Sequence, residues 1–371
     1  MQKKTKKILI LNDTKDWYHW GCFGTSLAIH EYLKKNNFNF NTIPIYELLK
    51  FHSLPTSLED FESKQIFFNH ENNLNKKIFK LIKQADLILV NGEGSIHHGN
   101  KIALIILYIC YASKKFLNKE VQIINHSSYP FEINPFKPVI RNLYKKVYSC
   151  IDYVAIREHL SLEILKNMGI QCSQSFDCLP ISISKFIDET NPFEKEKENE
   201  ILFAGGVNFE HAKLLSLYGV MQSLTKLNYK IKFIIGTPNK NYYASDDLSL
   251  VARLKEIDTQ KICEIIDTKS FGTWLSQINK AKLLISGRFH HTIAAYCLKT
   301  PYILFESNTP KNKALSEILK SDTPIRYDDE KFDKLLNDMV MKKINSENHP
   351  SNELLPTIIE MAEKNFTFIR K

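Results

Sequence analysis

The sequence lacks the cysteine pattern of a disulfide-stapled or zinc-stapled protein. Its seven cysteines are odd in number and irregularly spaced, and no Cys-x-x-Cys pair occurs. This pattern excludes a disulfide framework or a structural zinc site as the basis of the fold, and it favours reduced thiols in the cytosol. We therefore expect a cytoplasmic protein.

Long apolar runs are also missing. The basic start MQKKTKK is followed by only four apolar residues, too few for a signal peptide or a membrane helix. The longest apolar stretch, residues 102–112, is about half the length of a spanning helix, so it predicts a buried helix. Any membrane contact is therefore expected to be peripheral.

Nucleotide-binding and RNA-binding signatures are absent too. No GK[ST] follows a glycine loop, the dinucleotide spacing GxGxxG does not occur, and the lysines are scattered. The net charge of +9 must therefore serve another partner. It favours a small anionic substrate over nucleic acid, and it suggests a peripheral contact with the inner membrane face.

The length of 371 residues favours two domains, at about 150 residues per domain. Short apolar runs alternate with helical segments, and the runs are apolar on both faces, as in the covered parallel sheet of a doubly wound domain. The runs expected as strands are 7–12, 87–90, 121–125 and 153–156, then 201–204, 232–235, 283–285 and 302–305.

The polar segment 188–200 is the clearest linker. It predicts an N-terminal Rossmann-like domain at 1–187, a C-terminal one at 201–350, and a final helix in 351–371 that returns to the first domain. We expect an α/β protein of GT-B type, with two doubly wound domains facing across a cleft. Periodicity alone leaves one large sheet or another two-domain arrangement open.

Ligands of open α/β sheets bind at the carboxyl ends of the strands. One expected strand ends in Ser286, Gly287 and Arg288, and the following helix begins with His290 and His291. A helix start attracts anions, arginine offers a bidentate fork, and histidine delivers protons near neutral pH. The structural alternative is that Arg288 and His290 only make hydrogen bonds that stabilise the start of the helix.

Two further strand ends carry candidates. Arg157 follows 153–156 as a second anion clamp, with a surface pair between Arg157 and Glu158 as its alternative. The loop after 87–90 has glycines around an acidic residue, which predicts a backbone pressed close to a ligand or another segment. Its candidates for shaping the substrate cleft are Asn91, Gly92, Glu93, Gly94, Ser95 and His97.

Other residues at strand ends are more often caps or turn residues than catalysts. Adjacent His97 and His98 do not predict a metal site, because neighbouring side chains point apart. The weaker candidates are Asn12, His19, Gly21, Gly24, Thr25, Asn125, His126, Asn208, His211, Glu306, Ser307 and Asn308.

Four segments together resemble the polysaccharide pyruvyltransferase family: HWGCFGTS, NGEGSIHH, AIREHLSLEILKNMGI and SGRFHHTIAAYCLKTPYI. The resemblance implies a GT-B-like fold, an acceptor side in the first domain and a donor side in the second. It implies transfer from phosphoenolpyruvate to a sugar or glycan, without a cofactor or a metal ion. By position, Arg288 and His290 match the family's Arg-x-His, and Arg157 matches its other arginine.

On this resemblance, Arg157 and Arg288 are expected to hold the phosphate and carboxylate, and His290 to protonate the methylene carbon of the donor. A nucleotide-sugar glycosyltransferase is the alternative enzyme, in which Glu306 and Asn308 would hold ribose or phosphate and Arg288 the diphosphate. A non-catalytic subunit of a polysaccharide-assembly system is the third possibility, and it gives the Arg-x-His pair no purpose. The oligomeric state stays open.

Overall fold

The computed structural model describes residues 6–64, 73–131, 139–194, 196–207, 209, 213–346 and 351–370. The chain divides into two compact units. The first comprises Met1–Lys15, Thr25–Cys178 and Ile358–Lys371, and the second Asp16–Gly24 and Leu179–Thr357. The expected boundary at 188–200 is therefore displaced, because α9 (Leu179–Thr190) packs against α13 (Phe289–Cys297) inside the second unit.

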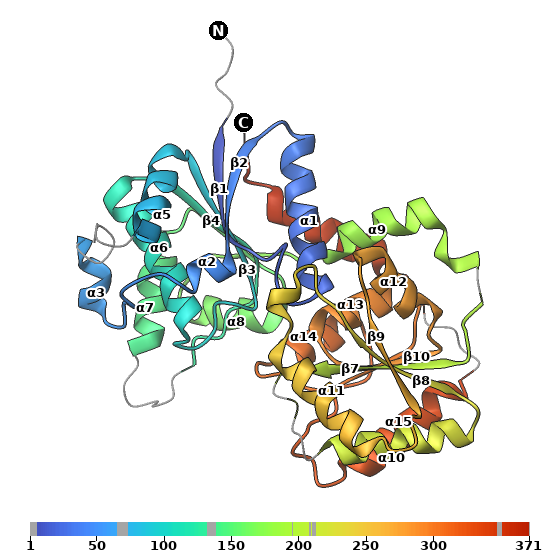
Figure 1. Cartoon of the computed structure of the whole chain (residues 1–371). Helices are drawn as coiled ribbons and strands as arrows, with labels where there is room; N and C mark the ends of the chain where they lie inside the picture. Colours follow the sequence, from blue (N-terminus) through green and yellow to red (C-terminus); the bar gives the residue numbers. More distant parts are fainter. Residues whose placement is uncertain are drawn as a thin grey trace. The chain divides into compact units, whose positions relative to one another are not determined.

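The end of the chain is part of the first unit. The side-chain amide of Asn365 donates to the carbonyl oxygen of Phe176 at 2.8 Å, and its Oδ1 accepts from the backbone N–H of Asn125 at 2.7 Å. The ring of Phe366 stacks on Tyr32 at 4.1 Å between centroids. These contacts bring the last residues to the sheet of the first unit (Figure 1).

The first unit contains a six-stranded parallel sheet in the order β2-β1-β3-β4-β5-β6. The central strands are buried on both faces, as their apolar sequences predict. Because β2 and β3 pair with opposite edges of β1, the strand order reverses between β1 and β3. The strands are β1 (Lys7–Asp13), β2 (Asn39–Pro44), β3 (Leu87–Glu93), β4 (Glu120–His126), β5 (Tyr153–Ile156) and β6 (Ser173–Gln174).

Helices cover both faces of this sheet, with α5, α6 and α7 on one side and α1 and the C-terminal segment on the other (Figure 1). The expected buried helix at 102–112 is α6, whose N-cap Asn100 accepts from the N–H of Ala103 at 2.8 Å. The helices are α1 (Trp20–Lys35), α2 (Ile45–Leu48), α3 (Leu58–Glu62), α5 (Asn73–Gln84), α6 (Lys101–Leu117), α7 (Val139–Tyr148), α8 (His159–Asn167), α16 (Leu355–Glu363) and the 3₁₀ turn η3 (Lys364–Phe366).

The second unit contains a five-stranded parallel sheet in the order β11-β10-β7-β8-β9. Its order reverses between β7 and β10, so this unit is doubly wound as well. The strands are β7 (Glu200–Gly206), β8 (Lys230–Ile235), β9 (Cys263–Asp267), β10 (Leu283–Gly287) and β11 (Tyr302–Leu304). The remaining helices are α10 (Lys213–Lys226), α11 (Ser245–Ile257), α12 (Phe271–Lys280), α14 (Lys311–Ile318) and α15 (Phe332–Ile344), with 3₁₀ turns η1 (Pro192–Glu194) and η2 (Lys240–Tyr242).

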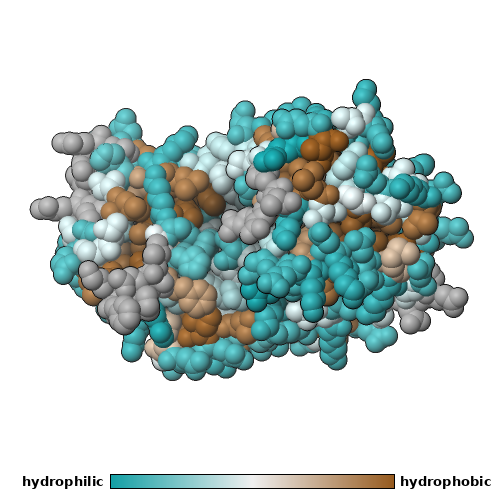
Figure 2. Space-filling model, turned by 90° about the horizontal axis from the view of Figure 1, so that it is seen from below, coloured by the Kyte–Doolittle hydropathy of each residue, from teal (hydrophilic) through white to brown (hydrophobic). Residues whose placement is uncertain are grey.

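The surface is mixed in polarity. The face seen in Figure 2 is largely hydrophilic, with apolar residues in small separate areas. Large exposed apolar side chains such as Leu215, at 67 % exposure, are normal when they occur singly. Among the described residues, none of the helices combines the length and the apolarity that crossing a membrane requires.

The core around α6 can be tested with a cavity mutation. Leu107 has no exposed surface, so Leu107→Ala should lower the free energy of unfolding by about 2–5 kcal/mol. Leu215→Ala, on the exposed side of α10, is the matched control and should change it by less than about 0.5 kcal/mol. Chemical denaturation followed by circular dichroism measures both. Equal effects of the two substitutions would contradict this description of the core.

Candidate active site

The carboxyl ends of β7 and β10 meet where the strand order of the second sheet reverses. Gly206 pairs with Gly287 there, and a Cβ atom on Gly206 would lie 2.9 Å from the Cα atom of Gly287. Only glycine permits this approach of two backbones. The loop after β10 is therefore fixed against β7, at the position where doubly wound sheets bind their ligands.

Arg288 follows β10 and immediately precedes α13. The residue is 4 % exposed, and its Nη2 donates to Oδ1 of Asp247 at 2.6 Å. Burial by itself lowers the pKa of Arg288, but the Asp247 carboxylate and the neighbouring Tyr18 raise it overall, so the group stays charged. Nε is buried and has no hydrogen-bond partner within the described part of the chain. One donor of the fork therefore has no partner among the described residues.

Asp247 was not predicted from the sequence. It lies in the first turn of α11, where an acidic residue is usually explained by the helix dipole. A Cβ atom on Gly205 would lie 2.3 Å from Oδ1 of Asp247, so the glycine makes room for this carboxylate. No local pattern links Asp247 to Arg288, because 41 residues separate them.

The two histidines after Arg288 have different surroundings. His291 lies within hydrogen-bond distance of Ser286, with 3.1 Å between Nδ1 and Oγ, and Ser286 Oγ accepts from the N–H of Arg288 at 3.0 Å. Burial and then the charge of Arg288 lower the pKa of His291 to about 3, so it is neutral. Ser286 and His291 thus brace the turn that carries Arg288. Their role in binding a substrate stays a prediction.

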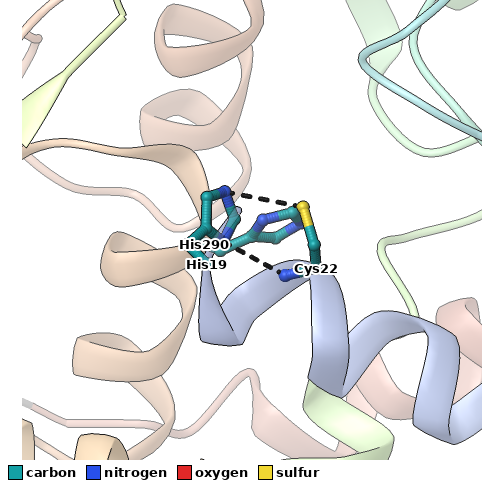
Figure 3. Close-up of side chains that lie close together, drawn as sticks. All are labelled: His19, Cys22 and His290. Atoms are coloured by element: carbon teal, nitrogen blue, oxygen red, sulfur yellow. Dashed lines mark hydrogen bonds between the residues drawn. The ribbon is translucent and has the colours of Figure 1, made fainter. Parts of the chain in front are cut away.

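His290 lies in the first turn of α13, 6 % exposed, beside the segment that leads into α1. The rings of His19 and His290 are 5.2 Å apart, at 64° to each other. A Cβ atom on Gly21 would lie 2.2 Å from Cβ of His290, so the first turn of α1 fits against this histidine without a side chain. Figure 3 shows His19, Cys22 and His290 converging from α1 and α13.

The nitrogen and sulfur atoms that His19, Cys22 and His290 could offer to a metal ion all lie within 4.8 Å of one another. However, Nδ1 of His19 accepts a hydrogen bond from the backbone N–H of Cys22 at 3.1 Å. In a neutral imidazole, the proton must then be on Nε2, the atom that faces Cys22. In this arrangement His19 presents a proton, not a lone pair, to the centre of the cluster.

In the first unit, polar side chains meet at the reversal between β1 and β3. Asn125 donates to Oδ1 of Asn91 at 2.9 Å, and Asn91 donates to Oε1 of Glu93 at 3.1 Å. Thr14 also donates to this oxygen, and Asn12 donates to the carbonyl of Asn91 at 2.7 Å. Asn91 and Glu93 are therefore held in an internal network of the unit, and their contact with an acceptor stays a prediction.

The glycine loop has a local explanation. A Cβ atom on Gly92 would lie 2.6 Å from Nδ1 of His126, so this glycine accommodates a buried side chain where we expected a ligand or another backbone. Burial, followed by the charge of Arg157, lowers the pKa of His126 to about 3. The turn continues with Ser95, whose N–H donates to the carbonyl oxygen of Gly92 at 3.0 Å.

His97 contacts Gly94 within the same loop, with 2.7 Å between its Nδ1 and the carbonyl oxygen. The structure therefore gives Gly94, Ser95 and His97 contacts inside the loop itself. A role of these residues in shaping a substrate cleft stays a prediction.

Arg157 is 2 % exposed, and its Nη1 donates to Oδ2 of Asp177 at 2.6 Å, while Nε donates to Ser127 Oγ at 2.8 Å. The surface pair between Arg157 and Glu158 is therefore wrong. Glu158 is buried and caps α8, where its carboxylate accepts from the N–H of Ser161 at 2.9 Å. The guanidinium of Arg157 belongs to an internal ion pair of the first unit, and its role as an anion clamp stays a prediction.

The residues after β11 are partly exposed. Glu306 Oε1 accepts from the N–H of Tyr327 at 3.0 Å, and Asn308 Oδ1 accepts from Lys311 at 3.2 Å. These contacts hold the loop that leads to α14, and a ligand role for Glu306 and Asn308 stays a prediction. Asn208 and His211 lie outside the described residues.

Two doubly wound parallel sheets in one chain, each with a glycine-bearing or polar loop at its reversal point, define a GT-B fold. Solved structures with this fold agree. UDP-GlcNAc 2-epimerase from Methanocaldococcus jannaschii is 13% identical, with 97% of this chain and 100% of that chain covered and a TM-score of 0.58. UDP-N-acetylglucosamine 2-epimerase from Rickettsia bellii is 13% identical, with 99% and 95% covered and a TM-score of 0.58.

UGT73P12 from Glycyrrhiza uralensis is 9% identical, with 98% and 91% covered and a TM-score of 0.50. At such identities, the likeness concerns the fold alone. The model of the polysaccharide pyruvyl transferase family matches residues 25–309, and the chain belongs to this family. It is therefore a transferase. None of the curated proteins matches the sequence. Arg157, Arg288 and His290 lie in the matched segment, whereas His19 and Cys22 precede it.

The fit of α1 against His290 predicts the effect of one added methyl group. Gly21→Ala places a Cβ atom where His290 already lies, so we expect a loss of about 1–3 kcal/mol in the free energy of unfolding. Gly219→Ala is the matched control, because a Cβ atom there meets nothing within 4 Å inside α10. The control should be neutral or stabilising by up to about 1 kcal/mol. Urea denaturation of both variants checks this, and wild-type stability of Gly21→Ala would refute the contact.

Proposed function

We propose that this chain transfers the pyruvyl group of phosphoenolpyruvate to two hydroxyl groups of a sugar, forming a pyruvate ketal in the synthesis of a surface polysaccharide. Family membership supports the class of reaction. The assignment rests on Arg288 and His290, which lie together at the start of α13. The guanidinium of Arg288 is buried, and its Nε has no hydrogen-bond partner among the described residues. Both groups suit a small, multiply charged anion.

Arg288 and His290 have separate roles in this proposal. Arg288 holds a phosphate or carboxylate of the donor, because a charged guanidinium offers planar N–H groups that match these anions. His290 delivers a proton to the methylene carbon of the donor. This step leaves positive charge at C2, where the oxygen of a sugar hydroxyl forms its bond.

The second half of the reaction releases phosphate. The bond between C2 and the phosphate oxygen breaks, and the second sugar hydroxyl adds to C2 to close the ketal. Of the two protons that the hydroxyls lose, one restores His290 and the other leaves with the phosphate. The phosphate of the donor is the leaving group, and the reaction needs no redox change and no cofactor.

Arg157 is a weaker candidate than Arg288 for binding the donor. Asp177 and Ser127 already hold its guanidinium, so we assign the donor contact to Arg288 first. We place the reaction in the cytoplasm, with a peripheral contact at the inner membrane face. The net charge of +9 supports an anionic donor, and it would also suit an acceptor carried on an anionic lipid surface.

Glycosyl transfer from a nucleotide sugar is the second candidate. It is favoured by one observation, the similarity of the fold to a UDP-GlcNAc 2-epimerase whose structure was solved in complex with UDP-GlcNAc and UDP. Glu306 and Asn308, after β11, would then contact the ribose or a phosphate, and Arg288 the diphosphate. The two candidates differ in donor chemistry, so a donor-binding experiment separates them.

Donor binding should raise the melting temperature, because a ligand that binds only the folded chain stabilises it. At 100 times its dissociation constant, phosphoenolpyruvate should add about 2.7 kcal/mol of stability. Differential scanning fluorimetry with phosphoenolpyruvate, inorganic phosphate and UDP-, GDP- and CMP-linked sugars measures this. A shift with a nucleotide sugar and none with phosphoenolpyruvate would replace the proposal with glycosyl transfer.

Substitution of the two site residues should affect catalysis differently. His290→Gln should lower kcat by roughly 10²–10⁴-fold if His290 is the general acid. Arg288→Lys should raise KM for the donor, because an ammonium group cannot replace a planar fork. The matched controls are His52→Gln and Arg326→Lys, both at exposed positions. Phosphate release under saturating acceptor reports these constants, and wild-type kcat in a folded His290→Gln variant would remove the residue from this role.

A further inference from the structure

Cys22 differs from the other cysteines in its surroundings. None of the seven cysteines, all of which lie in the described residues, forms a disulfide bond. Burial raises the pKa of five of them, to about 12 for Cys263 in one case, and these sulfurs are held as thiols. Those five are Cys110, Cys150, Cys172, Cys178 and Cys263. Cys22 is buried as well, at 2 % exposure, but it lies beside two imidazole rings in the first turn of a sixteen-residue helix.

His19 directs a proton at the sulfur of Cys22. Its Nδ1 accepts from the N–H of Cys22, and Nε2 lies 3.6 Å from Sγ. A ring nitrogen that accepts a hydrogen bond carries no proton, so the proton of the neutral ring is on Nε2. Burial, and then the neighbouring His290 and Arg288, hold the pKa of His19 well below its usual range, so the ring is neutral. The sulfur therefore accepts a hydrogen bond, which stabilises a negative charge on it.

The charges around His19 are positive, and positive charge also stabilises a thiolate. Arg288 and Lys311 both act on His19 as positive charges. Arg288 is more than nine-tenths buried, and its Nε lacks a partner within the described residues. The first turn of α1 adds the positive end of a helix dipole. Helix starts and neighbouring cations are the environments in which cysteines of other proteins react as thiolates.

From this geometry we propose that Cys22 is a modification site for small soft electrophiles, with His19 as the residue that positions and stabilises its thiolate. With an alkyl halide, the sulfur lone pair forms a bond to the carbon atom as the carbon–halogen bond breaks and halide leaves. The adduct would lie beside His290, whose ring nitrogen is within 4.8 Å of the sulfur. Modification should therefore block transfer, a consequence that rests on the proposed function.

A metal site is the competing explanation of the same three residues. Coordination through Nε2 of His19 would require the proton to move to Nδ1, which now accepts the N–H of Cys22. It would also place a dication next to Arg288, whose charge already acts on His19. Both observations favour the thiolate over a metal site.

The first experiment compares rates among the cysteines of the full chain. Folded protein is treated with limiting iodoacetamide at pH 7, and peptide mass spectrometry follows each site. Cys22 should be alkylated at least about tenfold faster than Cys150, Cys172 and Cys263, although all three are more exposed. An equal or slower rate at Cys22 would overturn the proposal. This readout needs no donor, so it stands even if phosphoenolpyruvate fails to bind.

The second experiment isolates the hydrogen bond from His19. His19→Asn keeps a side-chain oxygen that can cap the start of α1, but it removes the Nε2 proton donor. A hydrogen bond to a charged group contributes about 1.5–3 kcal/mol, so alkylation of Cys22 should slow about tenfold or more. The melting temperature shows whether the variant keeps its fold. An unchanged rate in folded His19→Asn would remove His19 from the proposal.

Two further measurements separate the thiolate from its alternatives. Iodoacetamide should abolish phosphate release by the wild-type enzyme but spare Cys22→Ser; loss of activity in both would mean that another site is responsible. Titration with Co²⁺ tests the metal explanation. A sulfur-to-cobalt absorption band that Cys22→Ser lacks would identify a metal site and overturn the proposal, and its absence agrees with the thiolate.

Discussion

The buried ion pair between Arg288 and Asp247 is the interaction on which the second unit's site depends. Two charges removed from water lose several kcal/mol of hydration each, and only close contact offsets that loss. The 2.6 Å hydrogen bond between them supplies it. Because Arg288 immediately precedes α13, this pair also fixes where the helix begins. The position of His290 follows from that start.

The first unit also contains a buried ion pair between an arginine and an aspartate, but its groups are more fully hydrogen-bonded. Arg157 and Asp177 form a buried pair at the carboxyl end of β5, and Thr25 donates to the second oxygen of Asp177 at 3.0 Å. Here both oxygens of the carboxylate and two of the guanidinium nitrogens are engaged. At Arg288, one buried nitrogen has no partner in the described residues. Because Arg288 has a nitrogen without a hydrogen-bond partner, it is the better candidate for binding an anion.

The ring of His19 links backbone structure to chemistry. One nitrogen satisfies an N–H group at the start of α1, where helix backbones lack internal partners. That bond decides which nitrogen carries the proton, and hence what the ring offers to Cys22 and His290. A residue that appears in the sequence only as a polar position after the first strand thus determines the chemical character of a three-residue cluster.

The alternation of strands and helices could be predicted from the sequence, because buried parallel strands such as β3 need continuous apolar runs. The sequence also located the ends of those strands, and with them Arg288 and His290. It missed β2, which is half-exposed at a sheet edge, and β9, whose residues are only partly buried. The pairing of Arg288 with Asp247, and the contact of Gly92 with His126, could not be predicted. Such contacts depend on strand order and on helix ends far apart in the chain, and no local pattern of residues carries that information.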